Sequence, residues 1–237
     1  MSSSKAFSTA LIVGAGSGIS ASLARLFASH GMTVALAARN PDKLAALSAE
    51  TGAHLFPVEA SDPAQVKRLF QAVEQKLGDP DVTVYNASGR LRGPLVDLDP
   101  AEVERALLVS GFGGFLVGQE AARRLLTRPE GVRGAILFTG ASASIKGYAR
   151  SAPFAMGKFA LRGLAQSMAR ELAPQGIHVA HFVIDGGVRS AARPDPAERL
   201  DSTLDPDAIA ETYWQILQQK RSAWTWEVEL RPWVENF

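Results

Sequence analysis

The stretch Ala10-Leu-Ile-Val13-Gly14-Ala-Gly16-Ser-Gly18-Ile-Ser20 joins a short apolar run to a glycine-rich turn. The apolar run predicts a buried strand, and the residues after the turn, through His30, have the pattern of a helix. Glycines between a strand and a helix allow the backbone to approach a pyrophosphate, whose charge the helix N-terminus meets. The stretch therefore predicts a phosphate-binding loop, and a mere tight turn is the alternative. The residues of the loop that would contact the cofactor are Gly14, Gly16, Ser17, Gly18 and Ile19.

Short β-rich runs alternate with longer helical patterns along the rest of the chain. Several of these runs are apolar at consecutive positions, which is typical of strands covered by helices on both faces. The alternation predicts one α/β domain over residues 1–237, a doubly wound, seven-stranded parallel sheet with helices on both faces. The expected strands are Ala10–Val13, Thr33–Ala38, His54–Val58, Val82–Tyr85, Ala135–Thr139, His178–Ile184 and Glu227–Leu230.

Four helices are predicted to begin where an Asn or Asp precedes a Pro, at Asn40, Asp62, Asp99 and Asp205. The polar side chain accepts hydrogen bonds from the first free N–H groups of the helix, and Pro has no N–H there to leave unpaired. Gln65 and Glu102, three residues after their caps, are expected to complete capping boxes. Two longer helices are predicted over 101–127 and 154–173.

Composition excludes several classes of function. The net charge of +1 is spread without a basic tract, which disfavours nucleic-acid binding, and the absence of Cys excludes disulfides and thiolate chemistry. The four His residues have no metal-ligand spacing, so no metal site is expected. The polar opening Met1–Lys5 is unlike a signal peptide, and no apolar run approaches the roughly 20 residues that span a bilayer. We expect a cytoplasmic protein without membrane contact.

Two further motifs carry a resemblance to a known family. Tyr85-Asn86-Ala87-Ser88-Gly89 ends the fourth strand, and Ser151-Ala-Pro-Phe154-Ala-Met-Gly-Lys158 begins a helix. With the glycine-rich turn they resemble the short-chain dehydrogenase/reductase family, in order and spacing, from residue 10 to about 190. The resemblance implies a Rossmann fold that binds a nicotinamide cofactor and transfers a hydride to or from a carbonyl or alcohol. It also implies further cofactor contacts at Glu59, Ala60, Asn86, Ala87, Ser88, Lys158, Gly186, Val188 and Ser190.

The second strand ends in Ala37-Ala38-Arg39, without an acidic residue. In dinucleotide-binding folds an acidic residue here binds the ribose 2′-hydroxyl, whereas Arg accommodates a 2′-phosphate. The sequence therefore favours NADP over NAD, and a solvated Arg39 at a strand end is the alternative.

The catalytic positions depart from the family. The resemblance implies Asn, Ser, Tyr and Lys, and the matching positions hold Ser110, Ala141, Phe154 and Lys158. Phe154 has no hydroxyl and cannot donate a proton as the family's Tyr does. Lys158 either binds the nicotinamide ribose or is an ordinary exposed helix lysine.

Other groups have to be considered as proton donors. Ser142 is adjacent to the missing Ser, Tyr148 follows in the loop that borders the substrate, and Tyr85 is expected to face the cofactor side. Each Tyr is otherwise a packed or surface aromatic residue. The candidate catalytic residues are Ser142, Tyr148 and Lys158, with a small-molecule substrate. Residues 189–204 form the one long irregular stretch, which is either a lid over the substrate or a surface loop.

A homodimer or homotetramer is expected through the helices at 101–127 and 154–173, with an alanine face at Ala165, Ala169 and Ala173. The C-terminal segment 224–237 holds Trp224, Trp226 and Trp233 and forms either a subunit contact or a cover for its own sheet. Three functions compete. An atypical NADP(H)-dependent oxidoreductase is favoured over a catalytically silent NADP(H)-binding protein with a regulatory or partner-binding role, and both over a purely structural subunit.

Overall fold

The computed structural model describes residues 7–234 and contains a sheet of seven parallel strands in the order β3-β2-β1-β4-β5-β6-β7. Nearly every residue of the central strands is buried, which explains their continuous apolar runs. The predicted sheet is confirmed, with strand ends displaced by at most one residue. The strands are β1 Thr9–Val13, β2 Thr33–Ala38, β3 His54–Pro57, β4 Val82–Tyr85, β5 Gly134–Thr139, β6 Ile177–Ile184 and β7 Glu227–Leu230.

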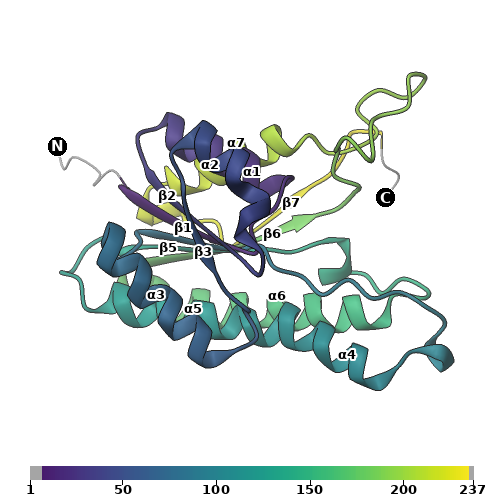
Figure 1. Ribbon diagram of the computed structural model, residues 1–237, viewed down its shortest axis with the longest axis horizontal. Helices are drawn as coiled ribbons and strands as arrows, with labels where there is room; N and C mark the ends of the chain where they lie inside the picture. Colours follow the sequence, from purple (N-terminus) through teal and green to yellow (C-terminus); the bar gives the residue numbers. More distant parts are fainter. Residues whose placement is uncertain (1–6, 235–237) are drawn as a thin grey trace.

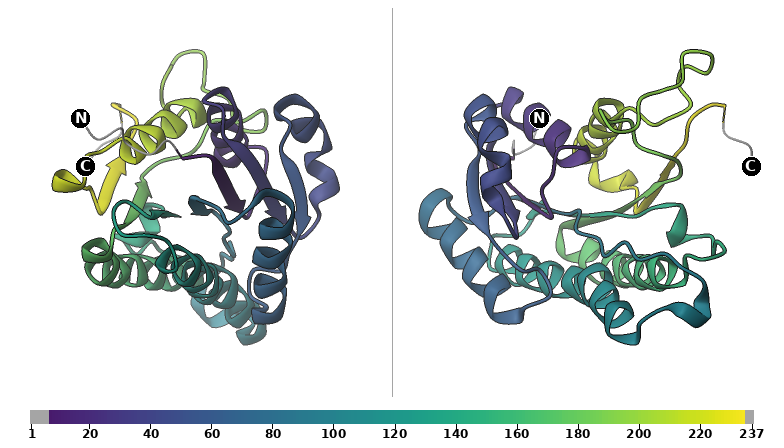
Figure 2. Two further views of the ribbon diagram at one scale, coloured as in Figure 1. Left: turned by 90° about the vertical axis from the view of Figure 1, so that its left-hand side faces the viewer. Right: turned by 45° about the vertical axis from the view of Figure 1, so that its right-hand side comes forward.

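Helices cover both faces of the sheet, as Figures 1 and 2 show. Each helical layer encloses its own hydrophobic core, with Phe27 and Tyr213 in one and Phe70 and Phe138 in the other. One layer consists of α1 Ile19–Ser29, α2 Ala45–Thr51 and α7 Pro206–Leu217. The other consists of α3 Pro63–Leu77, α4 Pro100–Leu107, α5 Gly113–Leu126 and α6 Ala152–Leu172.

Three of the four predicted helix caps are confirmed. Asp62, Asp99 and Asp205 each accept a hydrogen bond of 2.8 to 3.0 Å from the backbone N–H two residues further on. At Asn40 the predicted helix start is confirmed, because Pro41 begins the short 3₁₀ helix η1 (Pro41–Leu44), but the predicted side-chain cap is wrong: the Asn40 side chain forms no capping hydrogen bond and lines a cleft.

Neither predicted capping box forms. The Asp62 N–H donates to the Glu59 carbonyl, so Gln65 instead donates to the Asp62 carboxylate over 2.9 Å. Glu102 lies 3.6 Å from the Arg105 guanidinium, one turn further along α4.

The helix predicted over 101–127 is interrupted in its middle. A π-helical turn, η3 (Leu108–Phe112), separates α4 from α5. Tyr85, fully buried below this turn, donates a hydrogen bond to the Val109 carbonyl, and a Cβ at Gly113 would clash with the Tyr85 hydroxyl. The expectation that Tyr85 faces the cofactor side is therefore wrong: burial commits its hydroxyl to the backbone.

The strand order reverses between β1 and β4, and the carboxyl ends of these two strands border a crevice. Gly14 follows β1 with a φ of +82°, and a Cβ on it would clash with the backbone of Ala87, which follows β4. Only glycine fits this close approach. The fold thus places the two predicted cofactor loops side by side.

The alanine face of α6 does not lie at a subunit interface. Ala165 and Ala169 are only 1% and 9% exposed and pack in the core against the sheet, so this expectation is wrong. Small side chains let α6 approach its own sheet closely. The exposed apolar side chains around these helices are instead Leu108, Phe112, Phe115, Met156 and Phe159.

Two of the tryptophans near the C-terminus cover their own domain. The Trp224 ring stacks on His178 with ring centroids 4.6 Å apart, and Trp226 packs against the core beside Arg162. Trp233, by contrast, is 82% exposed. Residues 1–6 and 235–237, which include the polar opening and the end of the aromatic segment, lie outside the described residues.

Candidate functional site

A cleft along the carboxyl edge of the sheet holds most of the predicted site residues. It consists of two cavities of about 940 and 530 Å³ that share Asn86, Ser88 and Arg90. Predicted residues in the larger cavity are Gly14, Arg39, Glu59, Ala60, Asn86, Ala87 and Ser88. Those in the smaller one are Ile19, Asn86, Ser88, Lys158, Gly186, Val188 and Ser190.

Gly16, Ser17 and Gly18 lie in the turn between β1 and α1 and line neither cavity. A Cβ placed on Gly16 or Gly18 would meet no heavy atom within 4 Å, so the space beside this turn is open. No side chain caps the N-terminus of α1. Its first N–H groups are therefore free of a side-chain partner and suit an anionic ligand.

Ser20 is the residue that the sequence comparison places at the last glycine of the family pattern, and its hydroxyl forms hydrogen bonds that a glycine could not form. It is fully buried, accepts a 2.7 Å hydrogen bond from the Asn86 side-chain amide and lies 3.4 Å from the Gly14 carbonyl. The Ser20 hydroxyl, which a glycine would lack, thus connects the loop after β1 to the loop after β4.

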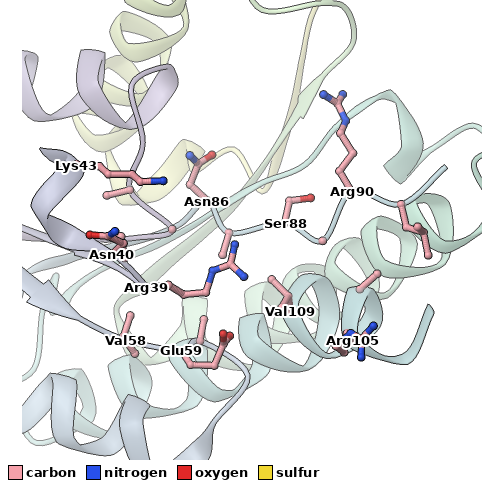
Figure 3. A pocket seen from close by; sticks show the side chains of 18 of the residues that line it. Arg39, Asn40, Lys43, Val58, Glu59, Asn86, Ser88, Arg90, Arg105 and Val109 are labelled. Atoms are coloured by element: carbon pink, nitrogen blue, oxygen red, sulfur yellow. The ribbon is translucent and has the colours of Figure 1, made fainter. Parts of the chain in front are cut away.

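One end of the larger cavity is positively charged. Figure 3 shows Arg39, Asn40 and Lys43 gathered there, with Arg39 extending into the cavity. Glu59 lines the same cavity, but its carboxylate accepts a 2.9 Å hydrogen bond from the Ser61 hydroxyl. Within residues 7–234 Arg39 forms no ion pair, so its charge is available to an anionic group.

Lys158 is buried, with 3% of its surface exposed, at the smaller cavity. Its Nζ donates a 2.7 Å hydrogen bond to the Thr139 carbonyl at the end of β5. Burial, and then the charge of Arg90, lower the pKa of this ammonium to about 8. The alternative of an exposed helix lysine is therefore excluded.

Phe154 lies one helical turn before Lys158, on the wall of the same cavity. The Arg90 guanidinium lies 5.3 Å from the centroid of its ring, a cation–π arrangement. A third cavity of about 490 Å³ opens beside Phe154 and is also lined by Ser142 and Tyr148. The structure thus brings both candidate hydroxyls to the cavity that borders Phe154.

The two hydroxyls differ in their surroundings. Tyr148 is 47% exposed at the mouth of the third cavity. Ser142 begins η4 (Ser142–Ser144) after β5 and lies next to Asp185. Burial of the Asp185 carboxyl raises its pKa, but hydrogen bonds from Lys146 and Ser142 outweigh burial and hold that pKa below its usual range.

Ser110, at the family's Asn position, has a structural partner. It is fully buried in η3, and its Oγ accepts a 2.9 Å hydrogen bond from the Gly89 N–H. A Cβ on Gly157 would clash with Ser110, so α6 passes close to it. Ser110 therefore fixes the loop after β4, and it lines none of the three cavities described here.

Asp185, at the family's Pro position, lies between two cations. Its carboxylate is 2.8 Å from Lys146 Nζ and 2.6 Å from the Arg231 guanidinium. Because Lys146 follows β5 and Arg231 follows β7, these ion pairs tie three neighbouring strand ends together.

Sequence reasoning missed five cations of this site. Lys43 and Arg105 line the larger cavity, and Arg90, Arg92 and Arg193 line the cavity beside Phe154. The pattern Gly89-Arg-Leu-Arg92 directly after a cofactor loop was a signal for two of them. For Arg193, more than a hundred residues away, the only signal was that the loop 189–204 could cover the substrate; nothing indicated that its side chain would join the other arginines.

No helix in residues 7–234 is long and apolar enough to span a membrane. The same residues contain no group of three or more His, Cys, Asp or Glu side chains arranged to hold a metal ion.

Comparison with known proteins identifies one family and several relatives of similar length. Residues 8–198 match the family described as short chain dehydrogenase. An uncharacterized oxidoreductase of Staphylococcus aureus (strain N315) is 27% identical over 232 residues, covering 94% of this chain and 96% of its own length.

Two solved structures cover nearly the whole fold. A short-chain dehydrogenase from Rhodopseudomonas palustris is 36% identical, with a TM-score of 0.81 over 95% of this chain and 99% of its own. A metagenomic short-chain oxidoreductase, solved in complex with NADP, is 26% identical, with a TM-score of 0.80 over 95% of this chain and 97% of its own. With the fold, the cleft and the family match in agreement, the chain belongs to the short-chain dehydrogenase family and is an oxidoreductase of that family.

Proposed function

We propose that the protein is an NADP(H)-dependent oxidoreductase that transfers a hydride to or from a carbonyl or alcohol carbon without the family's usual Tyr. One observation carries this proposal: the cleft is continuous from the Gly14 loop to Lys158, since both of its cavities share Asn86, Ser88 and Arg90. A dinucleotide bound there would reach from the charged end at Arg39 to the wall formed by Phe154.

The residues of the cleft fit NADP. Arg39 and Lys43 supply positive charge where the ribose 2′-phosphate would lie, and the open turn at Gly16 and Gly18 leaves room for the pyrophosphate. The structure of the metagenomic relative with NADP supports the same choice. NAD, which lacks the 2′-phosphate, would leave the Arg39 charge without a partner.

The bound nicotinamide would give the hydride in reduction and accept it in oxidation, and this chain would orient the substrate and give or accept the proton. Lys158, held by the Thr139 carbonyl, is placed to bind the nicotinamide ribose. Tyr148 and Ser142 carry the two hydroxyls at the cavity beside Phe154, and we assign proton transfer to Tyr148 Oη or, through water, to Ser142 Oγ. Losing a positioned general acid costs about 10²–10⁴ in rate, so slow turnover is expected.

We further propose that residues 189–204 act as a lid over the substrate. The base of this loop is closed by a bridge between Val188 and Leu204, and Ser190, Ala192 and Arg193 line the smaller cavity. Figure 2 shows the rest of the loop extending away from the sheet. A second copy of the chain is proposed to cover the exposed apolar side chains around α4, η3, α5 and α6.

A catalytically silent NADP(H)-binding protein is the alternative, favoured by Ala141 and Phe154 at two catalytic positions. NADPH titration followed by turnover on a carbonyl panel, for wild type, Phe154→Tyr and Tyr148→Phe, separates the two functions. We expect NADPH binding and slow turnover by wild type that falls in Tyr148→Phe. Binding without turnover in any variant would support the silent protein, as would turnover by Phe154→Tyr alone. Absence of NADPH binding would contradict both.

A further inference from the structure

Three arginines surround the cavity beside Phe154. Arg90 and Arg92 come from the loop after β4, whereas Arg193 comes from the loop at 189–204. Among residues 7–234, no acidic side chain lines this cavity; its other polar side chains are those of Ser142, Tyr148 and Ser151. The three arginines therefore come together only in the folded chain, where the two loops meet.

In the part of the chain that the structure describes, these cations have no carboxylate as a partner. Within residues 7–234, none of Arg90, Arg92 and Arg193 forms an ion pair, although the neighbouring loops contain Asp and Glu. Three carboxylates of the connection between β6 and α7 pair with other cations. Asp185 pairs with Lys146 and Arg231, and Asp195 and Asp205 both pair with Arg189.

The three charges lie close enough to repel one another. Partial burial, and then the charges of Arg92 and Arg193, lower the pKa of the Arg90 guanidinium. Like charges gathered in a cleft are unfavourable for the folded chain unless an anion offsets them. An oxyanion bound between them would remove this repulsion and gain charge-assisted hydrogen bonds.

Phe154 contacts one member of the cluster. Arg90 lies over its ring, and Arg90 lines all three cavities, so this contact helps to hold the guanidinium where the cavities adjoin. A ring is needed for this contact and a hydroxyl is not. Phe154 therefore has a role here even though it cannot donate a proton.

We propose that the substrate carries an oxyanion, a carboxylate or phosphate, which Arg90, Arg92 and Arg193 bind in the cavity beside Phe154. The volume of about 490 Å³ suits a small molecule. This inference rests on the proposed oxidoreductase function for its turnover arm, but the binding of the oxyanion does not depend on turnover.

The turnover arm compares pairs in which one member carries an oxyanion and the other is neutral: a 2-oxo acid with its methyl ester, and dihydroxyacetone phosphate with dihydroxyacetone. We expect the charged member of at least one pair to have the higher kcat/KM, and the pair that responds distinguishes carboxylate from phosphate. The preference should fall about tenfold or more in Arg92→Gln and Arg193→Gln, because a hydrogen bond to a charged group is lost. The control Arg68→Gln removes an exposed arginine on α3 that lines none of these cavities.

The binding arm uses calorimetry with benzoate, benzamide and inorganic phosphate, in the presence and absence of NADPH. Benzoate or phosphate should bind to wild type, and benzamide should not. Arg92→Gln should lower the affinity for the anion while changing NADPH affinity less than about twofold. Anion binding without turnover would overturn the oxidoreductase function and leave the oxyanion site in place. If neutral and charged substrates had equal kcat/KM and no anion bound, the oxyanion site alone would be overturned.

A comparison of Phe154→Leu with Phe154→Tyr tests whether the aromatic ring at position 154 supports Arg90 in binding the oxyanion. Leucine should reduce the preference for the charged substrate, whereas tyrosine, which keeps the ring, should retain it. An equal preference in both variants would contradict the role of the ring.

Discussion

The Asn86 side-chain amide donates a 2.7 Å hydrogen bond to the Ser20 hydroxyl and so joins the end of β4 to the first turn of α1. The larger and smaller cavities share Asn86, and the chain around the turn before α1 borders both of them, through Gly14 and Ile19. The position that departs from the family's glycine pattern therefore stabilises the region where the cofactor is proposed to bind.

Substituting Ser20→Ala should lower the free energy of unfolding by about 1 kcal/mol and weaken NADPH binding several-fold, because Asn86 loses its acceptor. Urea denaturation and fluorescence titration measure the two effects. The matched control is Ser29→Ala, which removes an exposed hydroxyl of the same helix. Equal behaviour of the two variants would show that the Ser20 contact has no effect.

Substituting Arg39→Ala should weaken NADPH binding by about tenfold or more and leave NADH affinity nearly unchanged. The reason is that the lost charge-assisted hydrogen bonds would go only to the 2′-phosphate. Titration with both cofactors measures the ratio, and Arg68→Ala serves as the control. A parallel loss for NADH would mean that Arg39 does not select the phosphate.

Lys158 should make stability depend on pH. Its folded pKa of about 8 lies below its ordinary value of 10.5, so the unfolded chain holds this proton more tightly. The cost of burying the charge is fully present below pH 8 and disappears as the pH rises to 10.5. Relative to Lys158→Met, wild type should therefore gain stability between pH 8 and 10.5.

Urea denaturation of both proteins at several pH values in this window measures the change. Lys67→Met, at an exposed position on α3, is the control and should show no such trend. A pH-independent difference between wild type and Lys158→Met would contradict a buried, titrating Lys158.

The exposed apolar face of the α4–α6 region should mediate self-association. Phe112 and Phe159 are 40% and 44% exposed, and Phe112→Glu with Phe159→Glu would place two charges at a contact between copies. Analytical ultracentrifugation should show a dimer or tetramer for wild type and a monomer for this double variant. Val132→Glu, at an exposed apolar position before β5, should keep the wild-type state. A wild-type monomer would exclude this role for the face.

Much of the fold could be predicted because its signals are local. Consecutive apolar residues in β1, β4 and β5 indicate strands buried on both faces, and Asp before Pro indicates where α3, α4 and α7 begin. The turn between β1 and α1 could be predicted for a related reason. Its glycines mark a sharp change of chain direction, although the close approach of Ala87 to Gly14 became evident only in the folded chain.

Other features could not be predicted because they depend on contacts between distant segments. The π-turn at η3 follows from the buried Tyr85 hydroxyl, and the alanine stripe of α6 could have faced either its own sheet or a partner. Periodicity marks which side chains of a helix lie together, but it does not determine what covers them.

The sequence by itself determined the strands of the sheet, the glycine-rich turn after β1 and the absence of a hydroxyl at Phe154, since each depends on neighbouring residues alone. Only the tertiary structure decided that Lys158 is buried and that Arg90 lies on the Phe154 ring. It also decided that Arg193 joins Arg90 at one cavity. The physical reason is that burial and charge proximity are set by packing between segments, whereas strand and turn formation are set mainly by short-range backbone preferences.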